Sequence, residues 1–323
     1  MSFVAGIGRA NIDLLYSGLS HIPREGEEVY SKDFDLQLGG GPVATMINLQ
    51  RLGVPVKVLT FLGKDMFSAF AEQRLHEYGI EAINLYGGGK IPVNISTAMI
   101  TGRDRTFVSY NQLQQTTADQ LKIAESEMKG AKIVEMQPGF LELYRKLKQK
   151  GTLLVLDMGW EDDLSFEKYR DYFELADYYT PNLKEALYLT GTDNPLDALK
   201  ILSQWFTKPI VKIGDQGCLI KDEEGIWQIP HIDEFESTDA TGAGDAFLSG
   251  FIYGLYHEAD FRTAILYGNI MGGKAVTEVG CLTASLSEQE LLHYADRYLN
   301  RIARISEKSH YTSIFPVNPS SSI

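Results

Sequence analysis

The sequence predicts an α/β protein built on a mostly parallel β-sheet with helices on both faces. In its second half, short apolar strands alternate with helical stretches, which implies a parallel sheet covered on both sides. These strands are expected at Lys132 to Met136, Leu153 to Asp157, Tyr178 to Thr180 and Ile210 to Ile213. Two earlier segments show the alternating pattern of a half-exposed antiparallel sheet instead. We therefore expect a large α/β body that carries a small extra sheet.

The chain opens with a strand followed by two polar residues. Phe3 to Ile7 is an apolar run of the kind that forms a buried strand. Asn11 and Asp13 follow with one residue between them, so both side chains point the same way in an extended chain. The small sheet is expected at about Ile12 to Leu38 and Pro92 to Tyr110, where turns separate alternating apolar and polar residues.

Glycines, prolines and capping residues predict where the other elements begin and end. Gly39-Gly40-Gly41-Pro42 starts a helix, Val56 to Leu62 is a buried strand, and Phe67 to Tyr78 is an amphipathic helix. A hairpin at the sheet edge is expected at Gly217 to Lys221 and Ile226 to Ile229, and later helices begin at Ala243, Asp260 and Ser287. Residues 1–310 are expected to form one domain, with a loose tail at 311–323.

Small residues predict close packing between the helices that start at Ala243 and Asp260. Ala246, Gly250 and Gly254 lie on one stripe of the first helix, and Ala264, Gly268 and Gly272 lie on one stripe of the second. Two such stripes let the helix backbones approach closely, which would hold the start of the first helix rigidly.

Composition excludes several classes of protein. The 323 residues are 44% hydrophobic and 23% charged, as is ordinary for a globular protein. The formal net charge of -13 disfavours nucleic acid and anionic membranes as partners, and no apolar run approaches a membrane span. Cys218 and Cys281 form neither a disulfide framework nor a four-cysteine zinc site. With no targeting signal at Met1 to Arg9, we expect a cytoplasmic protein.

The stretch Asp239-Ala-Thr-Gly-Ala-Gly-Asp245 predicts a site for an anion. Gly242, Ala243 and Gly244 bring nearly bare backbone amides to the start of a helix, where unpaired N–H groups and the helix dipole attract negative charge. Asp245 lies in the first helical turn, where the dipole is expected to keep it ionised. A phosphate cradle beside an anionic base suits phosphoryl transfer to a hydroxyl group. Taken alone, a glycine turn with a first-turn cap explains the same residues equally well.

Four motifs, in order, give the chain a family resemblance. They are Gly39-Gly40-Gly41, Asn182-Leu-Lys-Glu185, Lys212-Ile-Gly214-Asp-Gln-Gly217 and Asp239-Ala-Thr-Gly-Ala-Gly-Asp245. From about Phe3 to Arg304 the chain resembles the ribokinase (PfkB) family of sugar kinases. The resemblance implies a ribokinase-like three-layer α/β/α fold whose two half-exposed segments form a β lid that excludes water from the acceptor. The outer face of such a lid often pairs with a second copy, which implies a homodimer.

The resemblance implies catalytic and magnesium-binding roles. Asp245 is the base that deprotonates the acceptor hydroxyl, and Gly242, Ala243 and Gly244 form the anion hole. Asn182 and Glu185 organise Mg²⁺, its waters and the nucleotide phosphates, which suits hard oxygen ligands. A helix cap with a capping-box Glu fits the same spacing, so this alternative stays open.

The resemblance also implies where ATP and a monovalent cation bind. Lys212, Gly214 and Gly217 border the nucleotide, and Asn269 lines its adenine pocket. Asp239 and Thr241, together with the loop from Gly280 to Ser285, are similar to the family's monovalent-cation site. The expected cofactors are therefore ATP, Mg²⁺ and K⁺.

On the acceptor side, the resemblance assigns Asn11 and Asp13 to the sugar hydroxyls and Gly39 to Gly41 to close approach of the sugar. A carboxylate accepts two hydroxyl hydrogen bonds readily, although solvated polar residues at a strand end would give the same pattern. Many family members have an Asn that binds the sugar where this chain has Ala44, and Asn48 lies one helical turn farther on the same face. This departure leaves the identity of the sugar open.

The sequence therefore predicts an ATP-dependent, Mg²⁺-requiring kinase that phosphorylates a hydroxymethyl group of a small sugar or sugar acid. A nucleoside kinase of the same fold is the alternative, because Phe107, Tyr110 and Trp160 are available to line a base pocket. A nucleotide-binding regulator without turnover is a third interpretation, which the presence of Asp245 and Glu185 disfavours. The expected partners are a small-molecule sugar and ATP, with neither nucleic acid nor membrane.

Overall fold

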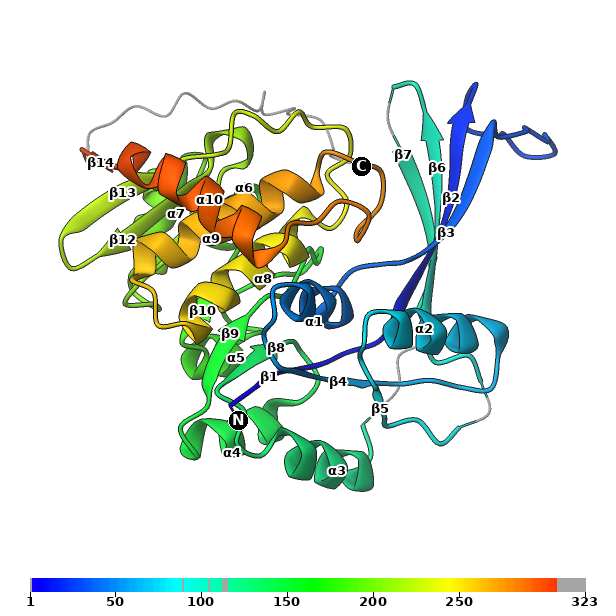
Figure 1. The fold of residues 1–323 in the computed structure, drawn as a ribbon, viewed down its shortest axis with the longest axis horizontal. Helices are drawn as coiled ribbons and strands as arrows, with labels where there is room; N and C mark the ends of the chain where they lie inside the picture. The colour runs from blue at the N-terminus through cyan, green and yellow to red at the C-terminus, as the bar shows by residue number, and fades with distance from the viewer. Residues whose placement is uncertain (1, 89, 104, 112–115, 307–323) are drawn as a thin grey trace.

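The computed structural model describes residues 2–306 apart from 89, 104 and 112–115, so the tail predicted at 311–323 lies outside the described residues. Its central sheet, sheet A, has parallel strands in the order β10-β9-β8-β1-β4-β5 (Figure 1). The strands are β1 (Val4–Ile7), β4 (Val56–Thr60), β5 (Ile83–Asn84), β8 (Ile133–Met136), β9 (Leu153–Leu156) and β10 (Tyr178–Tyr179). The predicted parallel sheet is confirmed.

Helices cover both faces of sheet A because its strands are apolar on both sides. In β1, Val4 joins the core on one face, and Ala5 and Ile7 join the core on the other. The first face is covered by α1 (Pro42–Arg51), α2 (Met66–Glu77), α8 (Ala243–Tyr256), α9 (Phe261–Ala275) and α10 (Glu288–Tyr298). The second is covered by α3 (Ala118–Met128), α4 (Leu141–Gln149), α5 (Arg170–Leu175), α6 (Leu183–Thr190) and α7 (Pro195–Leu202). Across the described residues, no helix is both long and apolar enough to cross a bilayer.

The contact between α8 and α9 confirms the packing predicted from small residues. A β-carbon on Gly250 would lie 2.6 Å from the backbone carbonyl carbon of Tyr267, and one on Gly254 would lie 2.6 Å from Cα of Ala264. Both distances are too short for real carbon atoms, so only glycine fits at these two positions. At the start of α8, the carbonyl oxygen of Ala243 would lie 3.1 Å from a β-carbon on Gly272, so α9 also packs closely on the first turn of α8.

A second sheet, which we call the lid sheet, stands beside the body at the upper right of Figure 1. It has the order β3-β2-β6-β7 and consists of β2 (Asn11–Leu19), β3 (Asp33–Leu38), β6 (Asn94–Thr101) and β7 (Arg105–Tyr110). The β2–β3 and β6–β7 pairs are antiparallel, as predicted, whereas β2 and β6 run parallel. The two half-exposed segments thus form one sheet.

A third sheet, sheet C, continues beyond β10. It contains β11 (Ile210–Lys212), β12 (Cys218–Asp222), β13 (Gly225–Ile229) and β14 (Ala303–Ile305), which pair antiparallel in that order. β11 was expected in the parallel sheet, and it meets that sheet through one bridge, between Asn182 and Lys212. The sequence does not predict β14, because a three-residue edge strand is too short to show a pattern.

Candidate active site

The predicted site residues gather at the carboxyl ends of the parallel strands, next to the lid sheet. β1 leads into Asn11 and Asp13, β9 leads into Asp157, and β10 leads into Asn182. Ligands of open α/β sheets bind in the crevice outside this edge. Asp157 is not among the predicted site residues, although its position directly after a buried strand is a signal for it.

The turn Gly242–Gly244, which we call the anion turn, opens α8. Gly242 is the N-cap residue, and its φ of 77° lies in the left-handed region that favours glycine. A β-carbon there would lie 2.7 Å from Cα of Cys281. No side chain caps this helix among the described residues, so its first amides remain available to an anion. Nζ of Lys212 would lie 3.7 Å from a β-carbon on Gly244, which places a positive charge beside the turn.

The carboxyl group of Asp245 lies between the anion turn and the glycine run before α1. A β-carbon on Gly40 would collide with its Oδ2, and Sγ of Cys281 lies 3.7 Å from the same oxygen. Burial, aided by the charge of Asp157, raises the pKa of Asp245 to about 7, against the opposing effects of the Gly41 backbone, Lys212 and Cys281. Burial therefore opposes the helix dipole, which was expected to keep this group ionised. A carboxyl group with a pKa near neutrality suits a general base.

Asn11 and Asp13 lie on the same side of β2, as predicted. Nδ2 of Asn11 donates to Oδ1 of Asp13 at 2.7 Å, and a β-carbon on Gly39 would lie 2.7 Å from the same Nδ2. Burial raises the pKa of Asp13 to about 6; Asn11 lowers it and the charge of Asp239 raises it. Nε2 of Gln137, which follows β8, would lie 3.9 Å from a β-carbon on Gly41. Gln137 was not predicted; together with Asn11, Asp13 and the glycine run Gly39 to Gly41 it forms what we call the acceptor wall.

Asn48 is the residue that could stand in for an Asn at position 44. In the structure it is linked through Arg51 to Leu282. Oδ1 of Asn48 accepts a hydrogen bond from Nη1 of Arg51 at 3.4 Å, and the same nitrogen donates to the carbonyl of Leu282 at 2.9 Å. Both Ala44 and Asn48 are buried in α1. A sugar-binding role for Asn48 stays a prediction.

Asn182 and Glu185 form the capping box of α6, which was the alternative to their metal role. The backbone N–H of Glu185 donates to Oδ1 of Asn182, and that of Asn182 donates to Oε2 of Glu185, both at 2.9 Å. Burial and the charge of Asp157 raise the pKa of Glu185, while Lys212 and the bonds from Asn182 lower it. Nζ of Lys212 also lies 3.6 Å from Oδ2 of Asp157. Asp157, Glu185 and Lys212 therefore form one cluster.

This cluster fits Mg²⁺ only as part of a wider coordination shell. In the part of the chain that the structure describes, no three His, Cys, Asp or Glu side chains are arranged to hold a metal alone. Mg²⁺ usually keeps several waters and binds one or two carboxylates together with substrate phosphates. Glu185 and Asp157 supply such carboxylates, so they would hold the ion when a nucleotide is bound.

Asp239 and Thr241 are brought together with the loop at Gly280, but they do not fit a monovalent cation. Asp239 pairs with Arg105 of the lid sheet, and the hydroxyl group of Thr241 donates to Oδ1 of Asp239 at 2.8 Å. The positive charge expected beside this carboxylate is therefore supplied by the chain itself.

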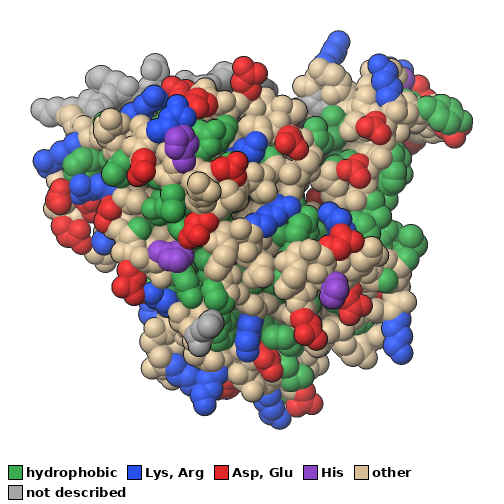
Figure 2. All heavy atoms as spheres, viewed as in Figure 1, with side chains coloured by type: hydrophobic (Ala, Val, Ile, Leu, Met, Phe, Trp, Pro, Cys, Tyr) green, Lys and Arg blue, Asp and Glu red, His purple; other side chains and the backbone are tan. Residues whose placement is uncertain are grey.

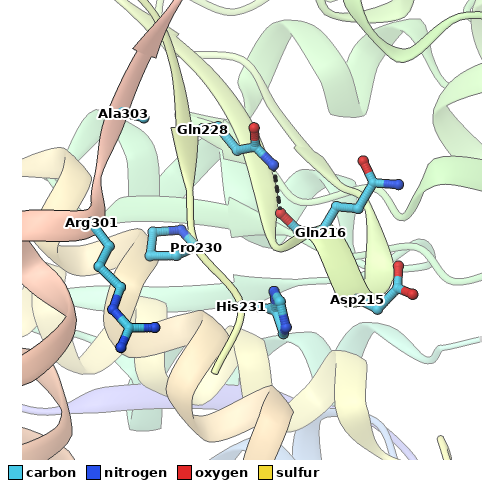
Figure 3. A pocket seen from close by; sticks show the side chains of 7 residues that line it. All are labelled: Asp215, Gln216, Gln228, Pro230, His231, Arg301 and Ala303. Carbon is cyan, nitrogen blue, oxygen red and sulfur yellow. Dashed lines mark hydrogen bonds between the residues drawn. The ribbon is translucent and has the colours of Figure 1, made fainter. Parts of the chain in front are cut away.

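The residues predicted for the nucleotide base surround the end of β13. Gly217 needs a φ of 86°, and Nδ2 of Asn269 donates to the carbonyl groups of Ile229 and Pro230 at 3.0 and 2.9 Å. A surface hollow of about 310 Å³ lies beside them (Figure 3). Its lining residues are Asp215, Gln216, Gln228, Pro230, His231, Arg301 and Ala303. The hollow borders the predicted nucleotide residues and does not include Asp245.

Comparison with known proteins decides the family. The family model described as pfkB family carbohydrate kinase matches residues 1–289. The chain belongs to the PfkB family of carbohydrate kinases. The predicted resemblance is thereby confirmed, and this PfkB kinase is a phosphotransferase.

One curated relative and two solved structures are similar to the PfkB kinase over most of its length. The ribokinase of Haemophilus influenzae is 24% identical over 306 residues, which are 90% of this chain and 97% of the relative. Arabidopsis thaliana ribokinase, solved with ribose and ATP, has a TM-score of 0.79 at 19% identity and covers 91% of this chain and 99% of its own. Methanocaldococcus jannaschii nucleoside kinase has a TM-score of 0.73 at 20% identity, with 92% and 99% covered. The two structures confirm the ribokinase-like fold.

Proposed function

We propose that this PfkB kinase transfers the γ-phosphoryl group of ATP to a hydroxymethyl group of a small sugar or sugar acid. The observation that supports this most directly is the place of Asp245. Its carboxyl group contacts Gly40 of the glycine run. Asp245 itself lies in the first turn of α8, directly after the anion turn. One carboxyl group thus lies beside both the acceptor wall and the phosphate cradle.

In the proposed reaction, Asp245 takes the proton of the acceptor hydroxyl group. The hydroxyl oxygen bonds to the γ-phosphorus while the bond from that phosphorus to the bridging oxygen of ADP breaks. The amides of the anion turn and the ammonium group of Lys212 face the charge on the transferred group. Asn11 and Asp13 hold the sugar hydroxyls against the glycine run.

ATP in this proposal lies along Lys212, Gly214 and Gly217 toward Asn269. Gly214 has a φ of 63°, and a β-carbon there would meet no described atom within 4 Å, so its backbone is open to a ligand. Mg²⁺ would be held through its waters by Asn182 and Glu185, with Asp157 as the second carboxylate, and it would neutralise the phosphates. The proposed location is the cytoplasm.

The test is ADP formation from ATP and Mg²⁺ with a panel of pentoses, hexoses, keto-deoxy sugar acids and nucleosides. Turnover with a sugar or sugar acid that is lost in Asp245→Asn, while ATP still binds, supports the proposal. Acceptor-independent ADP formation throughout the panel contradicts it.

A nucleoside acceptor is the second candidate, because one aromatic side chain lies on the inner face of the lid sheet. Phe107 pairs with Ala98 on the same face as Arg105 and is 47% exposed. Tyr110 lies on the opposite face, and Trp160 packs on Tyr188 with ring centroids 5.1 Å apart. In the same panel, Phe107→Ala lowers turnover of a nucleoside more than that of a sugar if this candidate is correct.

We also propose a homodimer through the outer face of the lid sheet. The strand register places Leu14, Tyr16, Phe34, Leu36, Met99 and Val108 on one face. Arg105 lies on the other face and reaches the body, so the apolar face points outward; Figure 2 shows hydrophobic side chains on this flank. Phe34 and Val108 are 50% and 63% exposed. A second copy would remove this apolar patch from water.

Light scattering after size exclusion tests the homodimer. Wild-type protein and Ile123→Asp, which alters an exposed apolar residue of α3, should be dimers, whereas Val108→Asp should be monomeric. A monomeric wild-type protein at micromolar concentration contradicts the proposal.

A further inference from the structure

Asp239 precedes the anion turn, and both oxygens of its carboxyl group are bonded. Oδ1 accepts hydrogen bonds from the backbone N–H of Thr241 at 3.1 Å and from the hydroxyl group of Thr241 at 2.8 Å. Oδ2 accepts from the backbone N–H of Gly280 at 3.0 Å. Asp239 therefore connects the chain entering the anion turn to the loop that begins at Gly280.

The positive charge that faces the Asp239 carboxylate comes from the lid sheet. Nη1 of Arg105, at the start of β7, forms an ion pair with Oδ1 of Asp239. The Asp239 side chain is 9% exposed and that of Arg105 is 31% exposed, so water screens the pair less than it screens a surface pair. Asp239 also lies close enough to raise the pKa of Asp13, although burial of Asp13 is the larger cause.

The opposite edge of the lid sheet touches the same part of the body. The hydroxyl group of Thr283 donates to Oε1 of Gln37 in β3 at 3.4 Å. Since β3 and β7 are the two edge strands of the lid sheet, the body is contacted from both edges. The position of the lid sheet and the shape of the anion turn are thereby linked.

We propose that Arg105 takes the place of a monovalent cation: its guanidinium group neutralises Asp239 and holds the anion turn, so catalysis needs the docked lid sheet and no K⁺. This inference rests on the proposed kinase function of the same site. A guanidinium group carries the same single charge as K⁺ but brings directed N–H donors. It therefore satisfies a carboxylate without the shell of oxygen ligands that a bound cation requires.

The first test compares the wild-type protein in KCl, NaCl and choline chloride at equal ionic strength. The melting temperature and kcat/KM should be the same in all three salts, because a ligand that binds only the folded state would raise the melting temperature. A higher melting temperature or a severalfold faster rate in KCl overturns the inference. The melting comparison decides this point even before an acceptor is known.

The second test compares Arg105→Ala with Arg103→Ala, a matched control in the β6–β7 turn whose side chain is exposed. Arg105→Ala should lower kcat/KM by roughly tenfold or more, the loss expected for a partly buried charge-assisted hydrogen bond. The melting temperature of Arg105→Ala should be higher in KCl than in choline chloride, because K⁺ can reach Asp239 once the guanidinium group is gone. Methylguanidinium should restore part of the rate.

The outcomes of the second test separate the two proposals. Arg103→Ala should match the wild type, and Arg105→Lys, which keeps the charge, should lie between the wild type and Arg105→Ala. If Arg105→Ala matches Arg103→Ala in every salt, the inference is wrong. If no acceptor supports ADP formation by the wild type, the proposed kinase function fails, while the melting temperatures still decide whether a cation binds.

Discussion

Sγ of Cys281 lies 3.7 Å from Oδ2 of Asp245 and directly against Gly242. A β-carbon on Gly40 would lie 3.8 Å from the same sulfur, so the thiol touches the glycine run, the anion turn and the proposed base. Burial and the nearby carboxylates raise the pKa of the Cys281 thiol well above its usual value, which keeps it protonated. It therefore acts as a weak hydrogen-bond donor that favours the ionised form of Asp245.

Cys281→Ala should raise the pKa of Asp245, because it removes this donor. The acid limb of the pH dependence of kcat/KM should move upward by about half a pH unit, since a net hydrogen bond of about 0.5–1.5 kcal/mol corresponds to roughly 0.4–1.1 units. Cys281→Ser keeps a donor and should stay near the wild-type profile. Identical profiles for Cys281→Ala and the wild type would remove Cys281 from the site chemistry.

The pKa of Asp245 predicts how the wild-type rate depends on pH. A base must be ionised to accept a proton, so kcat/KM should level off above about pH 7 and fall about tenfold per pH unit below that value. Asp245→Asn should lower turnover by roughly 10²–10⁴-fold and lose this acid limb. Steady-state kinetics with saturating Mg²⁺ give both results, and nucleotide binding by calorimetry is the control. Near-normal turnover in Asp245→Asn would show that another group is the base.

Replacing Glu135 on β8 with glutamine should stabilise the folded protein. It is fully buried, and neither of its oxygens has a hydrogen-bond partner among the described residues. Burial, and after it the charges of Asp245 and Asp157, raise its pKa well above the usual value, and the nearby Thr45 hydroxyl opposes this only weakly. The folded protein therefore binds a proton that the unfolded chain releases above about pH 4, so stability is lost as pH rises toward the folded-state pKa.

Glu135→Gln should remove this loss. The free energy of unfolding should exceed that of the wild type by an amount that grows with pH, by at most about 1.4 kcal/mol per unit between about pH 5 and 8. Urea unfolding across this range measures it, and Glu81→Gln, at an exposed position, is the control. Parallel stability curves for Glu135→Gln and the wild type would mean that Glu135 is already ionised in the folded protein.

Local patterns predict most of the fold, and tertiary contacts decide what they miss. Small residues at helical spacing suffice to predict that α8 and α9 pack closely, and the structure brings Gly250 against the backbone of Tyr267. The sequence does not predict the raised pKa of Asp245, because the helix dipole is visible in the sequence, whereas burial depends on segments far along the chain. The Arg105–Asp239 pair joins residues 134 positions apart, and an Arg beside a hairpin turn looks like any surface charge in the sequence. The parallel β2–β6 pairing is missed for the same reason.

Gly250→Ala tests how firmly α8 must hold the anion turn. The added β-carbon would lie 2.6 Å from the carbonyl carbon of Tyr267, and backbone atoms cannot move aside as a flexible side chain can. The variant should lose about 1–3 kcal/mol of stability, and any folded protein should lose kcat more than ATP affinity, because the start of α8 is displaced. Gly87→Ala is the matched control, since a β-carbon there would meet no described atom within 4 Å. If both variants keep wild-type melting temperature and turnover, the α8–α9 contact does not position the anion turn.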